Sequence, residues 1–201
     1  YPEYLSDVAV LACPSDDRNA EDIIDSMRFN EDPSQPINPC RFDADSYNYF
    51  GWALPDEDFY QAGTDMNDPA ISQTTVLSYI NPLMIVLIGQ ITSAAFPAWA
   101  NSNPPDPSLV DKDFSGSGLT VYRLKEGIER FFITDINNPA GSATAQSQLF
   151  VMWDDAALSP SLFNHIPGGA NVLFMDGHVE FVRYPNKSPI SRAGVVVLAV
   201  L

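Results

Sequence analysis

Positive charge is scarce in this 201-residue sequence, which has ten Lys and Arg residues against 26 Asp and Glu, a formal net charge of −16. Binding to nucleic acid requires basic side chains that contact phosphates, so this balance argues against nucleic acid as a partner. Docking on anionic lipid is disfavoured for the same reason. The composition instead fits an extracellular protein, soluble or polymeric, with carboxylates available for divalent cations.

The sequence also lacks the short motifs of common catalytic sites. It contains no Gly-x-Ser-x-Gly nucleophile motif and no phosphate-binding loop that ends in Gly-Lys. A hydrolase that uses paired carboxylates is left open, because 26 acidic residues always supply pairs. We therefore expect the protein not to be an enzyme.

Cysteine is nearly absent, with Cys13 and Cys40 the only two in the sequence. A Cys-x-x-Cys-His haem motif and a zinc-type pattern of cysteines are both missing. In an oxidising compartment we expect Cys13 and Cys40 to form a disulfide, and the alternative is two buried thiols.

Proline and glycine, in contrast, are frequent, with 17 and 11 residues, and 45% of residues are hydrophobic. These numbers predict a single domain over residues 1–201 with long irregular connections rather than a helix bundle. Because strand and helix patterns both occur along the chain, we expect an α+β fold. Its clearest element is a β-hairpin over residues 168–184. Two runs rich in Val, Phe and Leu flank Asp176-Gly177, a dipeptide typical of a type I′ turn between antiparallel strands.

Two uncharged segments stand out from the acidic composition. Residues 71–100 lie inside a region, 65–118, that we interpret as a helical insertion, with Asp68-Pro69 as its predicted helix start. The segment is long enough for a membrane span, but Asn81, Pro82 and Gln90 argue against one, and burial in the core or against a neighbouring subunit is expected. The tail 185–201 ends in a predicted strand, 193–201, that would pair within the subunit or extend a neighbour's sheet. The residues expected to mediate assembly are Leu83, Ile85, Leu87, Ile88, Val195, Val196, Val197, Leu198, Val200 and Leu201.

The stretch His165–Val179 resembles the H-X9-DG signature of prepilin-type, processing-associated bacterial proteins, a family without a characterised biochemical function; here ten residues instead of nine separate His165 from Asp176. Further resemblance lies in Val10–Asp16, in Ser46–Tyr49, in 122–139 and in Met152–Asp154. The resemblance implies a headgroup similar to those of type IV pilins and pseudopilins, a secreted or surface location, and a place in a filament or secretion apparatus.

The only two histidines, His165 and His178, lie near three aspartates in the sequence, Asp154, Asp155 and Asp176. Together they are candidate ligands for a cation, and calcium is the ion we expect, since the resemblance implies one that orders loops. The alternative is that Asp176-Gly177 only forms the turn and the histidines only bond neighbouring backbone.

The leading hypothesis is therefore a structural subunit of an extracellular pilin-like filament or surface appendage, a homopolymer assembled through apolar segments. The alternative is a secreted calcium- or glycan-binding module associated with a type II secretion or pilus-like system.

Overall fold

The computed structural model describes residues 5–42, 45–102, 106–116, 118–125, 127–128, 146–159 and 163–200. These residues form an α+β fold of short helices around an antiparallel sheet, so the predicted fold class is confirmed at this level. Most of the segment 122–139 and the terminal Leu201, both named in the sequence interpretation, lie outside the described residues.

The main sheet has four strands in the order β1-β4-β5-β6, and each strand is antiparallel to its neighbours. Along β5 the buried side chains alternate with half-buried ones, as expected where one face covers a core. A separate two-stranded sheet pairs β2 with β3. The strands are β1 Tyr47–Tyr49, β2 Phe114–Gly116, β3 Leu119–Val121, β4 Phe150–Asp154, β5 Gly169–Phe174 and β6 Val179–Arg183.

Residues 175–178 connect β5 to β6, but the turn differs from the predicted type I′. That turn requires a positive φ at both central residues, whereas in this loop only Gly177 has one, at 87°. The Gly177 amide donates to the Phe174 carbonyl at 2.9 Å, and the Phe174 amide donates to the His178 carbonyl at 3.0 Å. Asp176 therefore keeps an ordinary backbone conformation, and the glycine alone supplies the left-handed residue that closes the loop.

The longest helical segment begins at Pro82 rather than at the predicted Pro69. The side chain of Asn81 accepts from the Leu83 amide at 3.0 Å, and Pro82 takes the first helical position. Asp68 instead accepts from the Ala70 amide in a turn. The helices are α1 Ala20–Ser26, α2 Asp56–Phe59, α3 Pro82–Gln90, the π-helical turn η5 Ile91–Ala95, α4 Phe96–Ala100 and α6 Arg192–Leu198, with 3₁₀ turns η1 Val8–Leu11, η2 Phe29–Glu31, η3 Pro39–Arg41, η4 Val76–Ser78 and η6 Pro107–Leu109.

The predicted C-terminal strand is wrong, because the chain is helical there, in α6. The buried hydroxyl of Ser191 accepts from the Gly194 amide at 3.0 Å and starts the helix. Valine disfavours a helix by well under about 1 kcal/mol per residue, which is less than burying its side chain contributes. Val195, Val196 and Val197 are all buried, so packing overrides their preference for strand.

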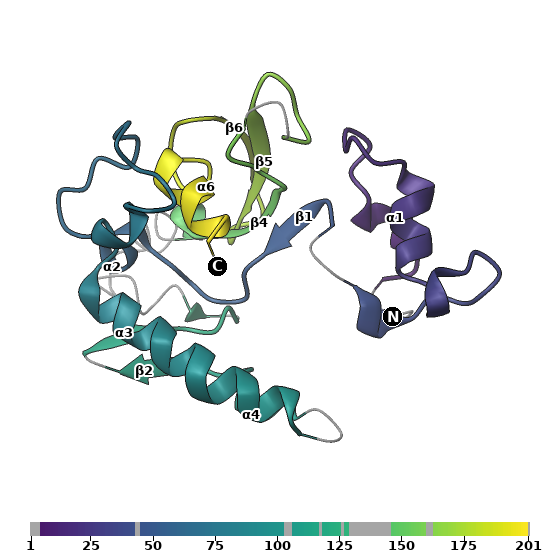
Figure 1. Cartoon of the computed structure of the whole chain (residues 1–201), viewed down its shortest axis with the longest axis horizontal. Helices are drawn as coiled ribbons and strands as arrows, with labels where there is room; N and C mark the ends of the chain where they lie inside the picture. Colours follow the sequence, from purple (N-terminus) through teal and green to yellow (C-terminus); the bar gives the residue numbers. More distant parts are fainter. Residues whose placement is uncertain are drawn as a thin grey trace.

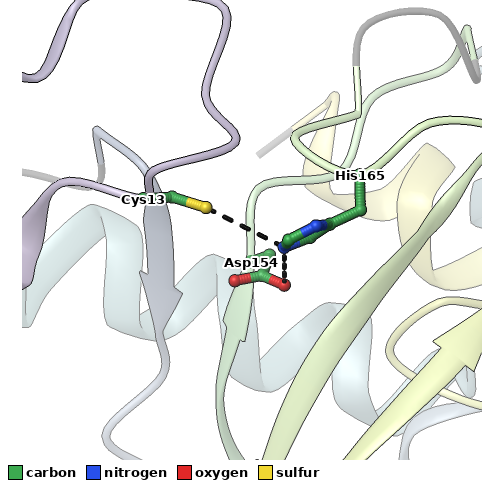
Figure 2. A group of neighbouring side chains, drawn as sticks. All are labelled: Cys13, Asp154 and His165. Atoms are coloured by element: carbon green, nitrogen blue, oxygen red, sulfur yellow. Dashed lines mark hydrogen bonds and ion pairs between the residues drawn. The ribbon is translucent and has the colours of Figure 1, made fainter.

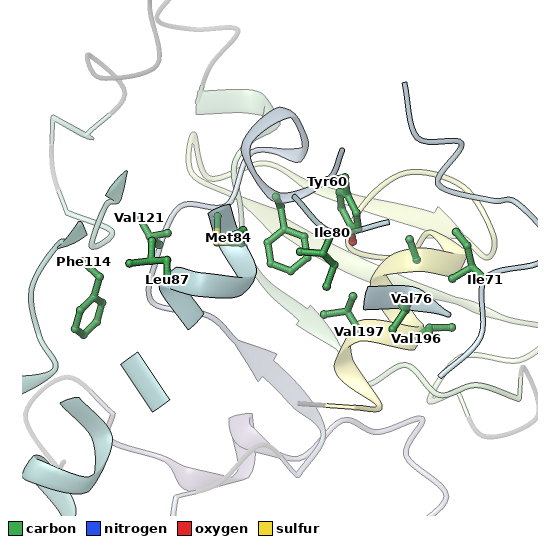
Figure 3. Close-up of a cluster of buried hydrophobic side chains, with 12 residues drawn as sticks. Tyr60, Ile71, Val76, Ile80, Met84, Leu87, Phe114, Val121, Val196 and Val197 are labelled. Carbon is green, nitrogen blue, oxygen red and sulfur yellow. The ribbon is translucent and has the colours of Figure 1, made fainter. Parts of the chain in front are cut away.

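Helix α6 lies between two hydrophobic cores, with α3 and the small sheet on one side and the main sheet on the other (Figure 1). The larger core also draws on the segment 65–118, so this region is built into the body of the protein (Figure 3). Its buried members are Phe59, Tyr60, Ile71, Val76, Ile80, Met84, Leu87, Phe114, Val121, Ala193, Val196 and Val197. The second core contains Trp153, Ala156, Phe163, Ala170, Val172, Phe174, Val182, Ile190 and Val195.

Residues 5–42, which we call the N-terminal lobe, lie at one end of the molecule beside β1 (Figure 1). The lobe has a small core of its own, in which Ala12, Ile23 and Met27 are buried. Polar contacts join it to the residues just before β1, among them the Arg18 guanidinium with the Asp45 carboxylate at 2.7 Å. The lobe is therefore held to the body partly by hydrogen bonds and ion pairs.

Candidate functional site

A cysteine from the N-terminal lobe meets an aspartate and a histidine from the region of β4 and β5 where the lobe faces the main sheet (Figure 2). Cys13 follows η1, Asp154 ends β4, and His165 lies in the loop before β5. Each offers one metal-ligating atom, and the three atoms lie within 4.8 Å of one another. We call this group the Cys13–Asp154–His165 cluster.

Asp154 is the most constrained member of the cluster. Its side chain is 4% exposed. Its Oδ2 atom accepts from the Asn171 amide at 2.6 Å and from the Asn171 side chain at 2.8 Å. The same oxygen lies 2.9 Å from Nε2 of His165. Because β4 and β5 are neighbours, Asn171 holds this carboxylate toward the histidine.

The imidazole of His165 presents one nitrogen to all its polar neighbours in the cluster. Nε2 lies 3.8 Å from Sγ of Cys13 and 3.2 Å from the side-chain nitrogen of Asn171. The His165 side chain is 25% exposed, so solvent reaches this side of the site. The ring also packs edge-on against Phe181 of β6, at 6.0 Å between centroids.

Residues around the cluster hold the lobe in place. Burial, together with the nearby Cys13 and Asp154, raises the pKa of Tyr47 to about 12, so its phenol stays neutral. For Asp16, burial alone would raise the pKa, but hydrogen bonds from the Arg18 backbone and the Ser46 hydroxyl outweigh it and lower the pKa below its ordinary value. The Ser46 hydroxyl donates to Asp16 at 2.7 Å.

The five residues predicted to bind a cation do not form one site. Asp154 and His165 meet, but the Asp155 carboxylate instead accepts from the Asn48 side chain at 3.0 Å. Asp176 and His178 form a separate pair beyond the other end of β5, with 2.5 Å between Oδ1 and Nδ1. The five-residue prediction is therefore wrong as a single site, because β5 separates its two halves.

The pair at the turn has a local role, but the His178 ring contacts the Asp176 carboxylate and not, as the alternative expected, neighbouring backbone. The backbone amide of His178, and then its side chain, hydrogen-bond to Asp176 and lower the pKa of that carboxyl. The His178 ring stacks on Phe174 at 4.5 Å between centroids. These contacts stabilise the turn.

The predicted disulfide is not formed. Cys13 is buried and Cys40 is exposed, and both are free. The Cys13 sulfur lies toward His165 instead of toward Cys40 (Figure 2). Sequence reasoning thus missed Cys13 as a member of the cluster.

The described residues among those predicted to mediate assembly are of three kinds: buried, exposed and partly buried. Val195, Val196, Val197 and Leu87 are buried in the cores, so they are not available to another subunit. Exposed members are Leu83, Ile85 and Val200, while Ile88 and Leu198 are partly buried. Pro82–Trp99, to which most of the exposed residues belong, is long and apolar enough to cross a membrane by length and composition only.

A largely apolar cavity of about 280 Å³ lies beneath this helix. Phe50, Trp52 and Phe114 line it together with Met84 and Ile88 of α3. This lining is mostly apolar, whereas the Cys13–Asp154–His165 cluster presents three metal-ligating atoms.

Comparison with protein-family models, with curated proteins and with solved structures finds no match to this chain.

Proposed function

We propose that the protein is a structural subunit of an extracellular pilin-like filament or surface appendage, assembled from copies of this chain through apolar contacts. The resemblance of His165–Val179 to the prepilin-type signature, the acidic composition and the α+β fold with an antiparallel sheet support this reading. The observation that carries it is the exposed apolar face of α3. The proposal assigns no catalytic reaction to the chain.

Helix α3 is apolar on both its inner and its outer side. Met84 and Leu87 face inward and are buried in the larger core (Figure 3). Leu83, Ile85 and Val86 remain 43%, 38% and 47% exposed. A helix on a protein surface normally carries polar residues on its outer side, and an apolar outer side typically marks a contact with a partner or a membrane.

The charge of the protein favours an interface at this place. Copies with a net charge of −16 repel one another, and α3 to α4 is a segment without charged residues. Contact through this segment keeps the carboxylates of two copies apart. Because salt screens the remaining repulsion over about 10 Å at 0.1 M, we expect assembly to strengthen as the salt concentration rises.

The assembly surface therefore differs from the one that the sequence suggested. The valines of α6 are core residues, so exchange of a C-terminal strand with a neighbour is not part of this proposal. Deleting residues 193–201 would remove core packing and unfold the subunit, and so would not test assembly.

A matched pair of variants tests the proposal. Val86→Glu places a charge on the outer side of α3, and Val10→Glu makes the same change at another exposed valine, in the N-terminal lobe. Light scattering after size exclusion and negative-stain microscopy would measure assembly at several salt concentrations. We expect polymers from the wild type and from Val10→Glu, and monomers from Val86→Glu.

Wild-type protein that remains monomeric under all these conditions, or Val86→Glu protein that still polymerises, would overturn the proposal. Flotation with vesicles of neutral lipid tests whether α3 binds a membrane instead of another subunit. If the wild-type monomer floats and Val86→Glu does not, the helix is a membrane element and not an interface between subunits.

A further inference from the structure

The Cys13–Asp154–His165 cluster brings a sulfur, an oxygen and a nitrogen ligand to one point. The three segments that supply them are separate in the sequence, and the lobe contributes only Cys13. Figure 2 shows the thiol and the carboxylate on the same side of the imidazole. A function of the cluster has to explain why these three atoms lie together.

A catalytic triad does not account for it. In a triad the nucleophile faces one ring nitrogen, which takes its proton, and the carboxylate faces the other ring nitrogen and orients the ring. Here Nε2 of His165 faces both Cys13, at 3.8 Å, and Asp154, at 2.9 Å. The geometry therefore lacks the opposed arrangement of a triad.

Hydrogen bonds within the protein explain only in part why the three ligand atoms lie together. One imidazole nitrogen either donates one hydrogen or accepts, so Nε2 cannot bond fully to the thiol, the carboxylate and the Asn171 amide group at once. A cation at their shared point would use the lone pairs of all three ligand atoms. Asn171 would then keep the carboxylate oriented, as residues behind metal ligands commonly do.

The chemical types of the three ligand atoms indicate which metal ion the cluster would bind. Calcium prefers oxygen ligands throughout, whereas a thiolate, an imidazole and a carboxylate together suit zinc and related divalent transition metals. Three protein ligands leave a fourth tetrahedral position, and the solvent exposure of His165 allows water to occupy it.

We propose that Cys13, Asp154 and His165 bind one Zn²⁺ or a similar divalent transition-metal ion, which joins the N-terminal lobe to the main sheet. The ion connects the turn after η1 to β4 and to the loop before β5. This site is independent of α3 and of assembly, and it replaces the calcium expectation with a different ion and a different ligand set.

Calorimetric titration of the full chain, reduced and treated with chelator, with ZnCl₂ tests the site. We expect one ion per chain for the wild type. Replacing one ligand should weaken zinc binding by at least about 100-fold. Loss of a residue that only supports a ligand weakens metal binding by up to about 100-fold, and loss of the ligand itself should cost no less. Cys13→Ser and His165→Gln change ligands, while Cys40→Ser and His178→Gln are matched controls that should bind as the wild type does.

Cobalt supplies a second measurement that does not depend on stability. Co²⁺ bound by the wild type should give a thiolate charge-transfer absorption that Cys13→Ser lacks. Zinc should also protect the lobe, residues 5–42, from limited proteolysis in the wild type and not in Cys13→Ser. Absent zinc binding by folded wild-type protein, equal binding by Cys13→Ser, or calcium binding as tight as zinc would each overturn the proposal.

Discussion

A single methyl group added at Gly194 would test whether the C-terminal residues form the helix α6. A Cβ atom at this position would overlap the carbonyl oxygen of Pro189 and lie 2.9 Å from its carbonyl carbon. These are backbone atoms next to the start of the helix, so they cannot move aside as a flexible side chain does. In an exposed strand, by contrast, replacing glycine with alanine would meet no such obstacle.

The magnitude follows from two opposing effects. Overpacking a core costs about 1–3 kcal/mol, and a clash with backbone belongs at the upper end. Alanine recovers about 1 kcal/mol through its better helix propensity. We therefore expect Gly194→Ala to lower the free energy of unfolding by about 2 kcal/mol, which for a chain of this size corresponds to a fall in Tm of about 4–8 °C.

Gly89→Ala in α3 is the matched control. A Cβ at Gly89 would meet nothing within 4 Å, and the residue is exposed in a helix. Alanine should therefore stabilise the protein by about 0.5–1 kcal/mol. Urea denaturation of dilute protein, followed by circular dichroism, measures both variants. A neutral or stabilising effect of Gly194→Ala would refute the packing of α6 described above.

Three further substitutions test single contacts. Ser191→Ala removes the buried cap of the Gly194 amide and should cost about 1–2 kcal/mol in urea denaturation, whereas an unchanged midpoint would contradict the cap. The pKa of Asp16 is lowered in the folded protein, so its carboxylate stabilises the fold above pH 3.8, its ordinary pKa, and this stabilisation is lost as the pH falls through the lowered folded pKa. Asp16→Asn should therefore be less stable than the wild type at neutral pH. The difference in Tm between the two proteins should disappear in acid. Lys187→Ala breaks an exposed ion pair with Glu180 and should change stability by less than about 1 kcal/mol, so a larger loss would indicate a structural role for that pair.

Strands were predicted correctly where the run is rich in Val, Phe and Leu, but not for β2, Phe114–Gly116, which lies in the region interpreted as a helical insertion. The runs on either side of Asp176-Gly177 become β5 and β6, which pair antiparallel. The dipeptide alone did not determine the type of turn, because Asp-Gly is compatible with more than one loop conformation. The hydrogen bonds of the loop decide which conformation forms.

Helix boundaries were predicted less well, because the chain offers two similar start signals. Asp68-Pro69 and Asn81-Pro82 both place a capping side chain before a proline, and only the second begins a helix. At the C-terminus the valines favour a strand by local preference, and burial in two cores decides for helix. Such tertiary packing is not visible in the local pattern.

The candidate metal site shows the same limit. Asp154 and His165 were both recognised as potential ligands, but the sequence does not tell which strand lies beside which. Cys13 joins them from the opposite end of the chain, so no local spacing could reveal its place. A cysteine placed beside metal-ligating groups and a cysteine in a disulfide look alike in the sequence, and only the fold separates them.

The position of α6 between the two cores affects the order in which the chain can fold. Ile190 and Val195 complete one core, and Ala193, Val196 and Val197 complete the other. During synthesis neither core can close until these residues have left the ribosome, although domains often begin to fold while the chain is still growing. The apolar surfaces of α3 and of the sheet therefore stay uncovered until α6 has emerged, and exposed apolar surface of this kind favours aggregation and capture by chaperones.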